Sequence, residues 1–139
     1  MLINNNIKIK YKNNKSKNYK KFKIGILGAG NIVENSHLPI YTKENLNIVN
    51  IFDIDLSKSK KLKKKFNIDK FSTNLDEFLN DKNIDIVDIA VPAKFNKNLF
   101  LKTLKKGKNI LIQKPLANNL KTASDILKHY NQSILKANV

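Results

Sequence analysis

The sequence lacks cysteine and arginine altogether, and it contains no long apolar run. The absence of cysteine excludes disulfides and thiolate metal sites, and it favours a reducing cytoplasm as the location. No stretch approaches the ~20 apolar residues of a membrane helix, and the N-terminus lacks the apolar core of a secretory signal. We therefore expect a cytoplasmic protein without a membrane partner.

Acidic residues are also scarce, with 11 against 27 basic ones, so the formal net charge is +16. Every basic residue is Lys, whereas Arg is the residue that reads phosphate and guanine through paired hydrogen bonds. The chain is rich in Asn and Ile too, and the codons of all three residues are rich in A and T. Codon bias accounts for this composition, so we expect no specific nucleic-acid partner. The alternative is weak, nonspecific phosphate binding through the Lys-rich segments.

The N-terminal segment differs from the rest of the chain. Residues 1–21 are mostly Lys and Asn and include no acid, since the first acidic residue is Glu34. We interpret this segment as a flexible extension, with a short strand at residues 3–11 as the alternative. Residues 22–139 are then one domain, which is large enough to bury a core of its own.

From Phe22 onward, short apolar runs alternate with segments of helical periodicity. The runs predicted as strands are 24–27, 48–52, 70–72, 84–91 and 109–112, and residues 133–139 begin a sixth. Predicted helices include one capped by Asn74, one with Phe95, Leu99, Thr103 and Leu104 on one side that ends at Gly107, and one with Leu120, Ala123, Leu127 and Tyr130 at a spacing of 3–4 residues. This alternation predicts an α/β fold with a doubly wound parallel sheet, whose ligands bind at the carboxyl ends of the strands.

A glycine-rich turn follows the first predicted strand and precedes a helix. Gly28 allows a tight turn, and Gly30 lets a pyrophosphate approach the backbone. The N–H groups of Asn31 and Ile32 then point at phosphate, at the positive end of the helix. Val33 stands where the fingerprint has its third glycine, and the alternative is an ordinary strand–helix turn. The strand and helix on either side favour a dinucleotide site.

Asp53 ends the second predicted strand, where the fingerprint expects an acid about 20 residues after the glycines. That carboxylate binds the ribose 2′-hydroxyl and repels a 2′-phosphate, so it favours NAD over NADP. Ser57 and Lys58, which follow, are compatible with NADP. The alternative role is that of a turn aspartate, but Asp55 is better placed to cap the next helix and leaves Asp53 available.

In this order, the motifs resemble the Gfo/Idh/MocA family, that of glucose–fructose oxidoreductase and inositol dehydrogenase. The segments that carry the resemblance are 28–32, 37–39, Asp53, 84–92 and 107–117. The resemblance covers residues 22–139 and corresponds to the N-terminal NAD(P)-binding Rossmann domain of the family. It implies an oxidoreductase that transfers hydride to or from a carbon that bears a hydroxyl group in a sugar or cyclitol.

The resemblance also implies roles for single residues. The family's Glu-Lys-Pro segment appears here as Gln113-Lys114-Pro115, in which Lys114 is the catalytic residue that orients a substrate hydroxyl. Gln113 keeps the hydrogen bonding of the glutamate without its charge. A family histidine is replaced by Asn96, which does not titrate near neutral pH. Gln113, Asn96 and Pro92 are expected at the cofactor, although Pro92 suits a plain strand–helix connection equally well.

The family's second domain, which shapes the substrate pocket, has no counterpart in the sequence. We therefore expect a truncated or split member that binds its cofactor but does not catalyse hydride transfer alone. Its expected partners are a separate substrate-domain chain or further copies of itself. The alternative function is a non-catalytic Rossmann module that senses the cofactor or binds a partner. Of the two histidines, His37 is expected to pack or cap, and His129 to lie at the surface.

Overall fold

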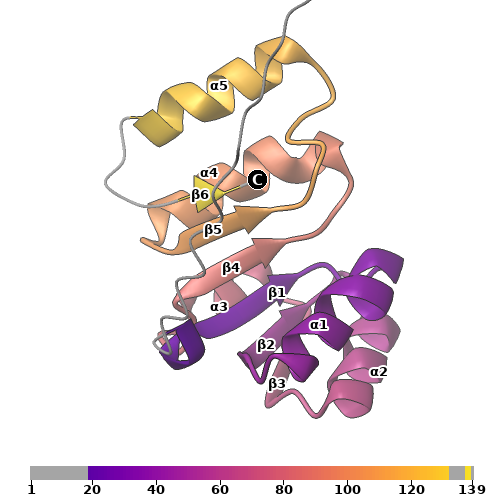
Figure 1. The fold of residues 1–139 in the computed structure, drawn as a ribbon. Helices are drawn as coiled ribbons and strands as arrows, with labels where there is room; N and C mark the ends of the chain where they lie inside the picture. Colours follow the sequence, from indigo (N-terminus) through magenta and orange to yellow (C-terminus); the bar gives the residue numbers. More distant parts are fainter. Residues whose placement is uncertain (1–18, 132–136, 139) are drawn as a thin grey trace, which may run out of the picture.

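The computed structural model describes residues 19–131 and 137–138 of the chain. Its centre is a six-stranded sheet in the order β3-β2-β1-β4-β5-β6, in which every neighbouring pair is parallel (Figure 1). The strands are β1 (Lys23–Leu27), β2 (Asn47–Phe52), β3 (Lys70–Ser72), β4 (Ile86–Ile89), β5 (Asn109–Ile112) and β6 (Ala137–Asn138). The order reverses between β1 and β4, which makes this a doubly wound Rossmann fold and confirms the predicted fold class.

Helices cover both faces of the sheet. They are α1 (Leu38–Lys43), α2 (Leu56–Phe66), α3 (Leu75–Asn80), α4 (Asn96–Lys105) and α5 (Leu120–Asn131), with the 3-10 turns η1 (Tyr19–Lys21) and η3 (Ala93–Phe95) and the π-helical segment η2 (Val33–His37). Leu38 of α1 and Leu62 of α2 belong to one apolar cluster, while Phe78 of α3 and Phe100 of α4 belong to another. The right-handed crossovers of a parallel sheet require this division.

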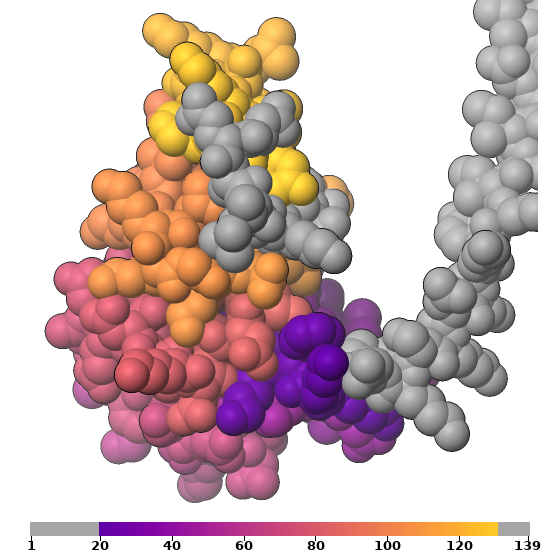
Figure 2. Space-filling model, turned by 90° about the vertical axis from the view of Figure 1, so that its left-hand side faces the viewer, coloured from indigo at the N-terminus to yellow at the C-terminus, as the bar shows by residue number. Residues whose placement is uncertain are grey.

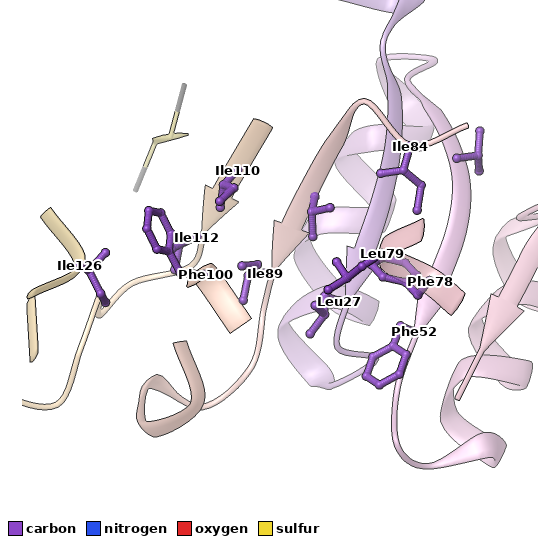
Figure 3. Packing of buried hydrophobic residues seen from close by; sticks show 12 residues of the cluster. Leu27, Phe52, Phe78, Leu79, Ile84, Ile89, Phe100, Ile110, Ile112 and Ile126 are labelled. Atoms are coloured by element: carbon purple, nitrogen blue, oxygen red, sulfur yellow. The ribbon is translucent and has the colours of Figure 1, made fainter. Parts of the chain in front are cut away.

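The apolar cluster that contains Phe78 and Phe100 extends across both halves of the sheet. Phe52 of β2 packs against Phe78, with ring centroids 5.8 Å apart, and Figure 3 shows this pair at one end of the cluster. At the other end, Ile112 of β5 lies among Phe100 and Ile126 of α5 (Figure 3). All five side chains are at least nine-tenths buried, so the cluster fixes the strand ends where the expected ligand site lies.

Local sequence signals set several element boundaries as predicted. The Asn74 side chain accepts hydrogen bonds from the N–H groups of Asp76 and Glu77, which starts α3. Asp55 accepts a hydrogen bond from the Ser57 N–H at 2.9 Å and starts α2. Gly107 adopts φ +69° directly after α4.

Two predicted apolar faces are correct only in part: Leu99, Leu104 and Tyr130 pack against the core and Thr103 is fully buried, but other members are exposed. Phe95 is 48% exposed, because it lies in η3 before α4 begins, and Phe100 takes the buried position instead. On α5, Leu120 is 86% exposed and Leu127 is 51% exposed, whereas Ile126 is buried. Apolar residues lie on both sides of these helices, so spacing alone identified only some of the residues that face the core.

The ends of the chain are described only in part. Residues 1–18 and the strand considered at residues 3–11 lie outside the described residues, while residues 19–21 form η1. Of the predicted sixth strand, residues 137–138 form β6 beside β5. In the part of the chain that the structure describes, no helix is long and apolar enough to cross a membrane. Figure 2 shows pink and magenta residues at one end of the molecule and yellow residues at the other, with the indigo beginning of the described chain at the side.

Candidate functional site

The residues that follow the strands meet along one edge of the sheet. Hydrogen bonds continue the ladder just beyond the strand ends: Asp53 N–H donates to Ser72 C=O, Gly28 N–H to Phe52 C=O, Ala90 N–H to Leu27 C=O, and Gln113 N–H to Ile89 C=O. The donor–acceptor distances are 3.3, 2.7, 2.9 and 2.9 Å in that order. The structure thus places the predicted turn, the predicted aspartate and the Gln113–Pro115 segment along the same carboxyl edge.

The glycine turn has two glycines with different surroundings. Gly28 has φ +114°, and a Cβ there would lie 2.4 Å from the carbonyl oxygen of Ala90. Only glycine fits this position, because both the backbone conformation and the neighbouring chain exclude a side chain. A Cβ on Gly30 would meet no atom within 4 Å, so the space above this residue is open.

A helical segment starts at Asn31, immediately after the turn. Asn31 and Ile32 are exposed, while Val33 is fully buried beneath them. The first N–H groups of a helix have no partner within it, so those of Asn31 and Ile32 are available to an anion. The open cradle at Gly30 and these N–H groups fit a pyrophosphate. A bound nicotinamide dinucleotide would supply the hydride chemistry, and the protein would supply position and electrostatics.

Asp53 braces the turn from the neighbouring strand. One carboxylate oxygen accepts a hydrogen bond from the Ala29 N–H at 2.7 Å, and the other accepts one from the Asp55 N–H at 2.9 Å. Each oxygen has a further lone pair, so the carboxylate still has acceptor capacity for a ribose hydroxyl. Ile54, next to it, is 87% exposed, which leaves an apolar side chain uncovered beside the carboxylate of Asp53.

The Gln113-Lys114-Pro115 segment follows β5. The Gln113 Oε1 accepts a hydrogen bond from the Lys114 N–H at 2.8 Å, and the peptide bond between Lys114 and Pro115 is cis. The Lys114 side chain is exposed, and among residues 19–131 it has no acidic partner within ion-pair distance. Its ammonium group is thus available to a ligand at the carboxyl edge.

Two other residues predicted at the cofactor, Asn96 and Pro92, differ in their burial and in their contacts. Asn96 is fully buried, and its amide group donates to the carbonyl oxygens of Pro115 and Leu116, both at 3.1 Å. It therefore holds the turn after Lys114 in place, and the direct cofactor contact expected from the resemblance stays a prediction. Pro92 is exposed at the edge and starts η3.

A buried acid that the sequence analysis did not single out lies beneath this edge. Asp88 of β4 is fully buried, and its Oδ2 lies 2.7 Å from His37 Nδ1 and accepts a hydrogen bond from the Tyr41 hydroxyl at 2.9 Å. The hydrogen bond to Asp88 raises the pKa of His37, against the effect of its partial burial. Burial raises the pKa of Tyr41, and the charge of Asp88 adds to this rise.

The network reaches the predicted catalytic segment. His37 Nε2 lies 3.0 Å from the Gln113 amide nitrogen, so the histidine bridges β4 and the end of β5. His37 makes no capping hydrogen bond at the start of α1, so the predicted capping role is wrong, while the predicted packing is seen in its ring contact with Tyr41, with ring centroids 5.9 Å apart. The available signal was Asp88 itself, because an acid inside an apolar strand requires buried partners. His129 is exposed, as predicted.

Comparisons with known proteins agree with this geometry. Residues 22–137 match the Gfo/Idh/MocA family, described as an oxidoreductase family with an NAD-binding Rossmann fold. An uncharacterized protein of Saccharomyces cerevisiae is 35% identical over 109 residues, which are 76% of this chain and 31% of the yeast protein. The glucose-6-phosphate 3-dehydrogenase of Bacillus subtilis is 34% identical over 102 residues, 73% of this chain and 28% of that enzyme. The chain thus spans about a third of the length of these relatives.

Solved structures show the same fold. The myo-inositol dehydrogenase of Lactobacillus casei, in complex with NAD(H) and myo-inositol, has a TM-score of 0.76 at 23% identity and is matched over 84% of this chain and 36% of that one. A 3-ketoreductase of Actinomadura kijaniata, in complex with TDP-benzene and NADP, has a TM-score of 0.75 at 19% identity over 84% of this chain and 36% of that one. The chain therefore belongs to the Gfo/Idh/MocA oxidoreductase family, of which it is an NAD-binding Rossmann-fold domain.

Proposed function

We propose that the chain forms the cofactor half of a cytoplasmic oxidoreductase that transfers hydride between NAD and a hydroxyl-bearing carbon of a sugar or cyclitol. The observation that carries this proposal is the shared edge of the sheet. There the open backbone at Gly30, the carboxylate of Asp53 and the exposed side chain of Lys114 follow the strands β1, β2 and β5, whose carboxyl ends share this edge. The names of the relatives, which act on a sugar phosphate or bind an inositol, support this substrate class.

Asp53 supports NAD as the preferred cofactor. Its two oxygens are fixed by backbone N–H groups, so the carboxylate does not turn away from a ligand that approaches the turn. A 2′-phosphate at this position would meet a fixed negative charge, whereas a 2′-hydroxyl would donate a hydrogen bond. NADP would have to bind through the neighbouring Ser57 and Lys58, both of which are exposed.

Lys114 is the residue to which we assign the substrate hydroxyl. Its ammonium would orient the hydroxyl oxygen and stabilise negative charge that develops there during hydride transfer. The other half of the substrate pocket would come from a second domain, from a separate chain or from further copies of this one. Light scattering at two protein concentrations, with and without NADH, would distinguish a monomer from a self-association.

The cofactor step is tested by NADH fluorescence. We expect saturable enhancement with the wild-type chain and weaker binding of NADPH. The variant that tests the binding site is Gly30→Ala. It adds one methyl group in open space, so the chain should stay folded, and it should lower the affinity for NADH about tenfold or more. Absence of any change at millimolar NADH, with wild-type chain shown to be folded by circular dichroism, would exclude the proposal.

The chemical step is tested separately with NAD and a panel that includes glucose 6-phosphate and myo-inositol. Formation of NADH that depends on Lys114, and that Lys114→Met abolishes without loss of NADH binding, would support the assigned reaction. Binding without turnover, by the chain alone and with any co-purifying partner, would instead favour a cofactor-sensing module.

A further inference from the structure

The buried network below the carboxyl edge is coupled to the catalytic segment by hydrogen bonds between side chains. We propose that His37 is a positioning residue: fixed by Asp88 in its Nδ1–H tautomer, it orients the Gln113 amide and, through that amide, the backbone of Lys114. The role assigned to Lys114 rests on the proposed function, but the hydrogen-bonded linkage itself does not. Three steps establish the linkage.

The first step is the tautomer of His37. Asp88 is acceptor-only when ionised, and its Oδ2 lies 2.7 Å from His37 Nδ1, so that ring nitrogen carries a proton. The Tyr41 hydroxyl donates to the same oxygen at 2.9 Å and limits its freedom to rotate. In the neutral ring, Nε2 is therefore an acceptor that points toward Gln113.

The second step is the orientation of the Gln113 amide. Its NH₂ group donates to His37 Nε2 at 3.0 Å, while its Oε1 accepts from the Lys114 N–H at 2.8 Å. Both hydrogen bonds form only in this orientation, because a flipped amide would place the NH₂ against the Lys114 N–H and the oxygen against an unprotonated ring nitrogen. The neutral, Nδ1–H form of His37 thus selects the amide orientation that holds the backbone of Lys114.

The third step is the effect of His37 protonation on the Gln113 amide. A proton on Nε2 would face the NH₂ of Gln113, so the amide would flip to present its oxygen and would release the Lys114 N–H. The groups that face His37 are Asp88 from β4 and Tyr41 from α1, with Lys114 the next charged group beyond Gln113. On the helical segment of His37 itself, Glu34 is paired with Lys61 and Lys65 of α2.

Gln113 is what makes the backbone of Lys114 sensitive to the charge of His37. A glutamate at this position, which the family resemblance leads one to expect, would accept from both the His37 Nε2–H and the Lys114 N–H without rotating. Gln113→Glu should therefore keep the Lys114 hydrogen bond whether His37 is charged or neutral. This substitution adds no atoms to the side chain beyond the exchange of NH₂ for oxygen, so it is a close match for the wild-type chain.

The tautomer can be measured directly by long-range ¹H–¹⁵N correlation spectra of the uniformly labelled chain. The chain has only two histidines, so the spectrum of His129→Gln assigns the signals of His37 without further labelling. Above its titration midpoint, His37 should show a protonated Nδ1 and an unprotonated Nε2. A majority of the Nε2–H tautomer would overturn the proposal.

The linkage is measured by following the backbone amide of Lys114 across the pH range in which His37 titrates. In the wild-type chain, the Lys114 amide should shift with the same midpoint as the His37 ring and should exchange faster with solvent at low pH. In Gln113→Glu, His37 should titrate at a higher pH and the Lys114 amide should stay hydrogen-bonded throughout. A Lys114 amide that ignores the His37 titration in the wild-type chain would overturn the proposal.

The two proposals fail in different ways. The spectra above need no ligand, so they test the linkage even if NADH does not bind. If NADH binds, its affinity should fall about two- to tenfold as His37 becomes protonated, which is the worth of one hydrogen bond, and Gln113→Glu should remove that dependence. If Gln113→Glu does not fold, Asp88→Asn is the second variant: it should lower the midpoints of His37 and the Lys114 amide together, and separate movement of the two would contradict the linkage.

Discussion

Two carboxylates near the same edge of the sheet are held in opposite ways. Asp53 is partly exposed and accepts hydrogen bonds only from backbone N–H groups of nearby turns. Asp88 is fully buried and is held by the side chains of His37 and Tyr41, while its Oδ1 has no partner among the described residues. A site built from backbone is altered chiefly by changes in chain conformation, whereas a site built from buried side chains fails when one partner is removed.

The largest effect should come from Gly28→Ala, in the turn that the Asp53 carboxylate holds through backbone N–H groups. The added Cβ would lie 2.4 Å from the Ala90 carbonyl oxygen at a φ that side chains rarely adopt. We expect a loss of about 4 kcal/mol in the free energy of unfolding, from overpacking and backbone strain together. Urea unfolding followed by circular dichroism measures this, with Gly30→Ala as the control that should change stability by less than about 1 kcal/mol. Equal losses in both variants would contradict the distinction between the two glycines.

The side-chain network around Asp88 is disrupted by His37→Ala. This variant leaves the buried carboxylate of Asp88 with Tyr41 as its remaining partner, which should cost about 3 kcal/mol of stability. His129→Ala, on the exposed side of α5, is the control and should stay within about 0.5 kcal/mol of wild type. A His37→Ala chain as stable as its control would show that Asp88 needs no second partner.

The pH dependence of the unfolding free energy tests the contribution of His37 to the network at Asp88. The pKa of His37 is raised in the folded chain, so the folded state binds the proton more tightly than the unfolded state does. The stabilisation from this group is then fully present below the unfolded pKa of about 6.5 and is lost as the pH rises through the folded value. The difference in unfolding free energy between wild type and His37→Ala should shrink as the pH rises from about 6.5 through the raised folded pKa of His37. A difference that grows over this range would mean that the pKa is lowered instead.

Asp53→Asn should have the smallest effect on folding. The amide oxygen would still accept from one of the two backbone N–H groups, while its NH₂ would face the other, so we expect a loss of about 1 kcal/mol. The larger effect should appear in cofactor preference, because NADPH would no longer meet a negative charge at the ribose position. Parallel titrations with NADH and NADPH measure this, and an unchanged ratio of the two affinities would remove Asp53 from the ribose site.

The difference between contacts made by nearby backbone and contacts made by distant side chains also explains which features could be predicted from the sequence. The turn at Gly28–Gly30, the cap at Asp55 and the acid at Asp53 follow from local spacing, because backbone conformation and neighbouring residues decide them. The doubly wound parallel sheet followed from the alternation of strands and helices, because the crossovers between parallel strands place helices on both faces.

The network at Asp88 could not be predicted in the same way. Its partner His37 lies 51 positions earlier in the sequence, and Gln113, on the far side of Asp88, is 76 positions from His37. Spacing does not show which side chain a buried acid meets, and only the packing of η2 and α1 on the sheet brings these residues together. The buried position of Asn96 escaped prediction for the same reason, because its partners are the carbonyl groups of a distant turn.

We expect the turn after β1 to bind the pyrophosphate of NAD through its backbone. A ¹H–¹⁵N correlation spectrum recorded during titration with NADH tests this most directly, because it reports on each N–H group separately. If this turn binds the cofactor, the shifts should be saturable and largest at Gly30, Asn31 and Ile32, with smaller shifts at Ile54 beside Asp53. A spectrum of the folded chain that does not change at millimolar NADH, or that changes only away from this turn, would contradict it.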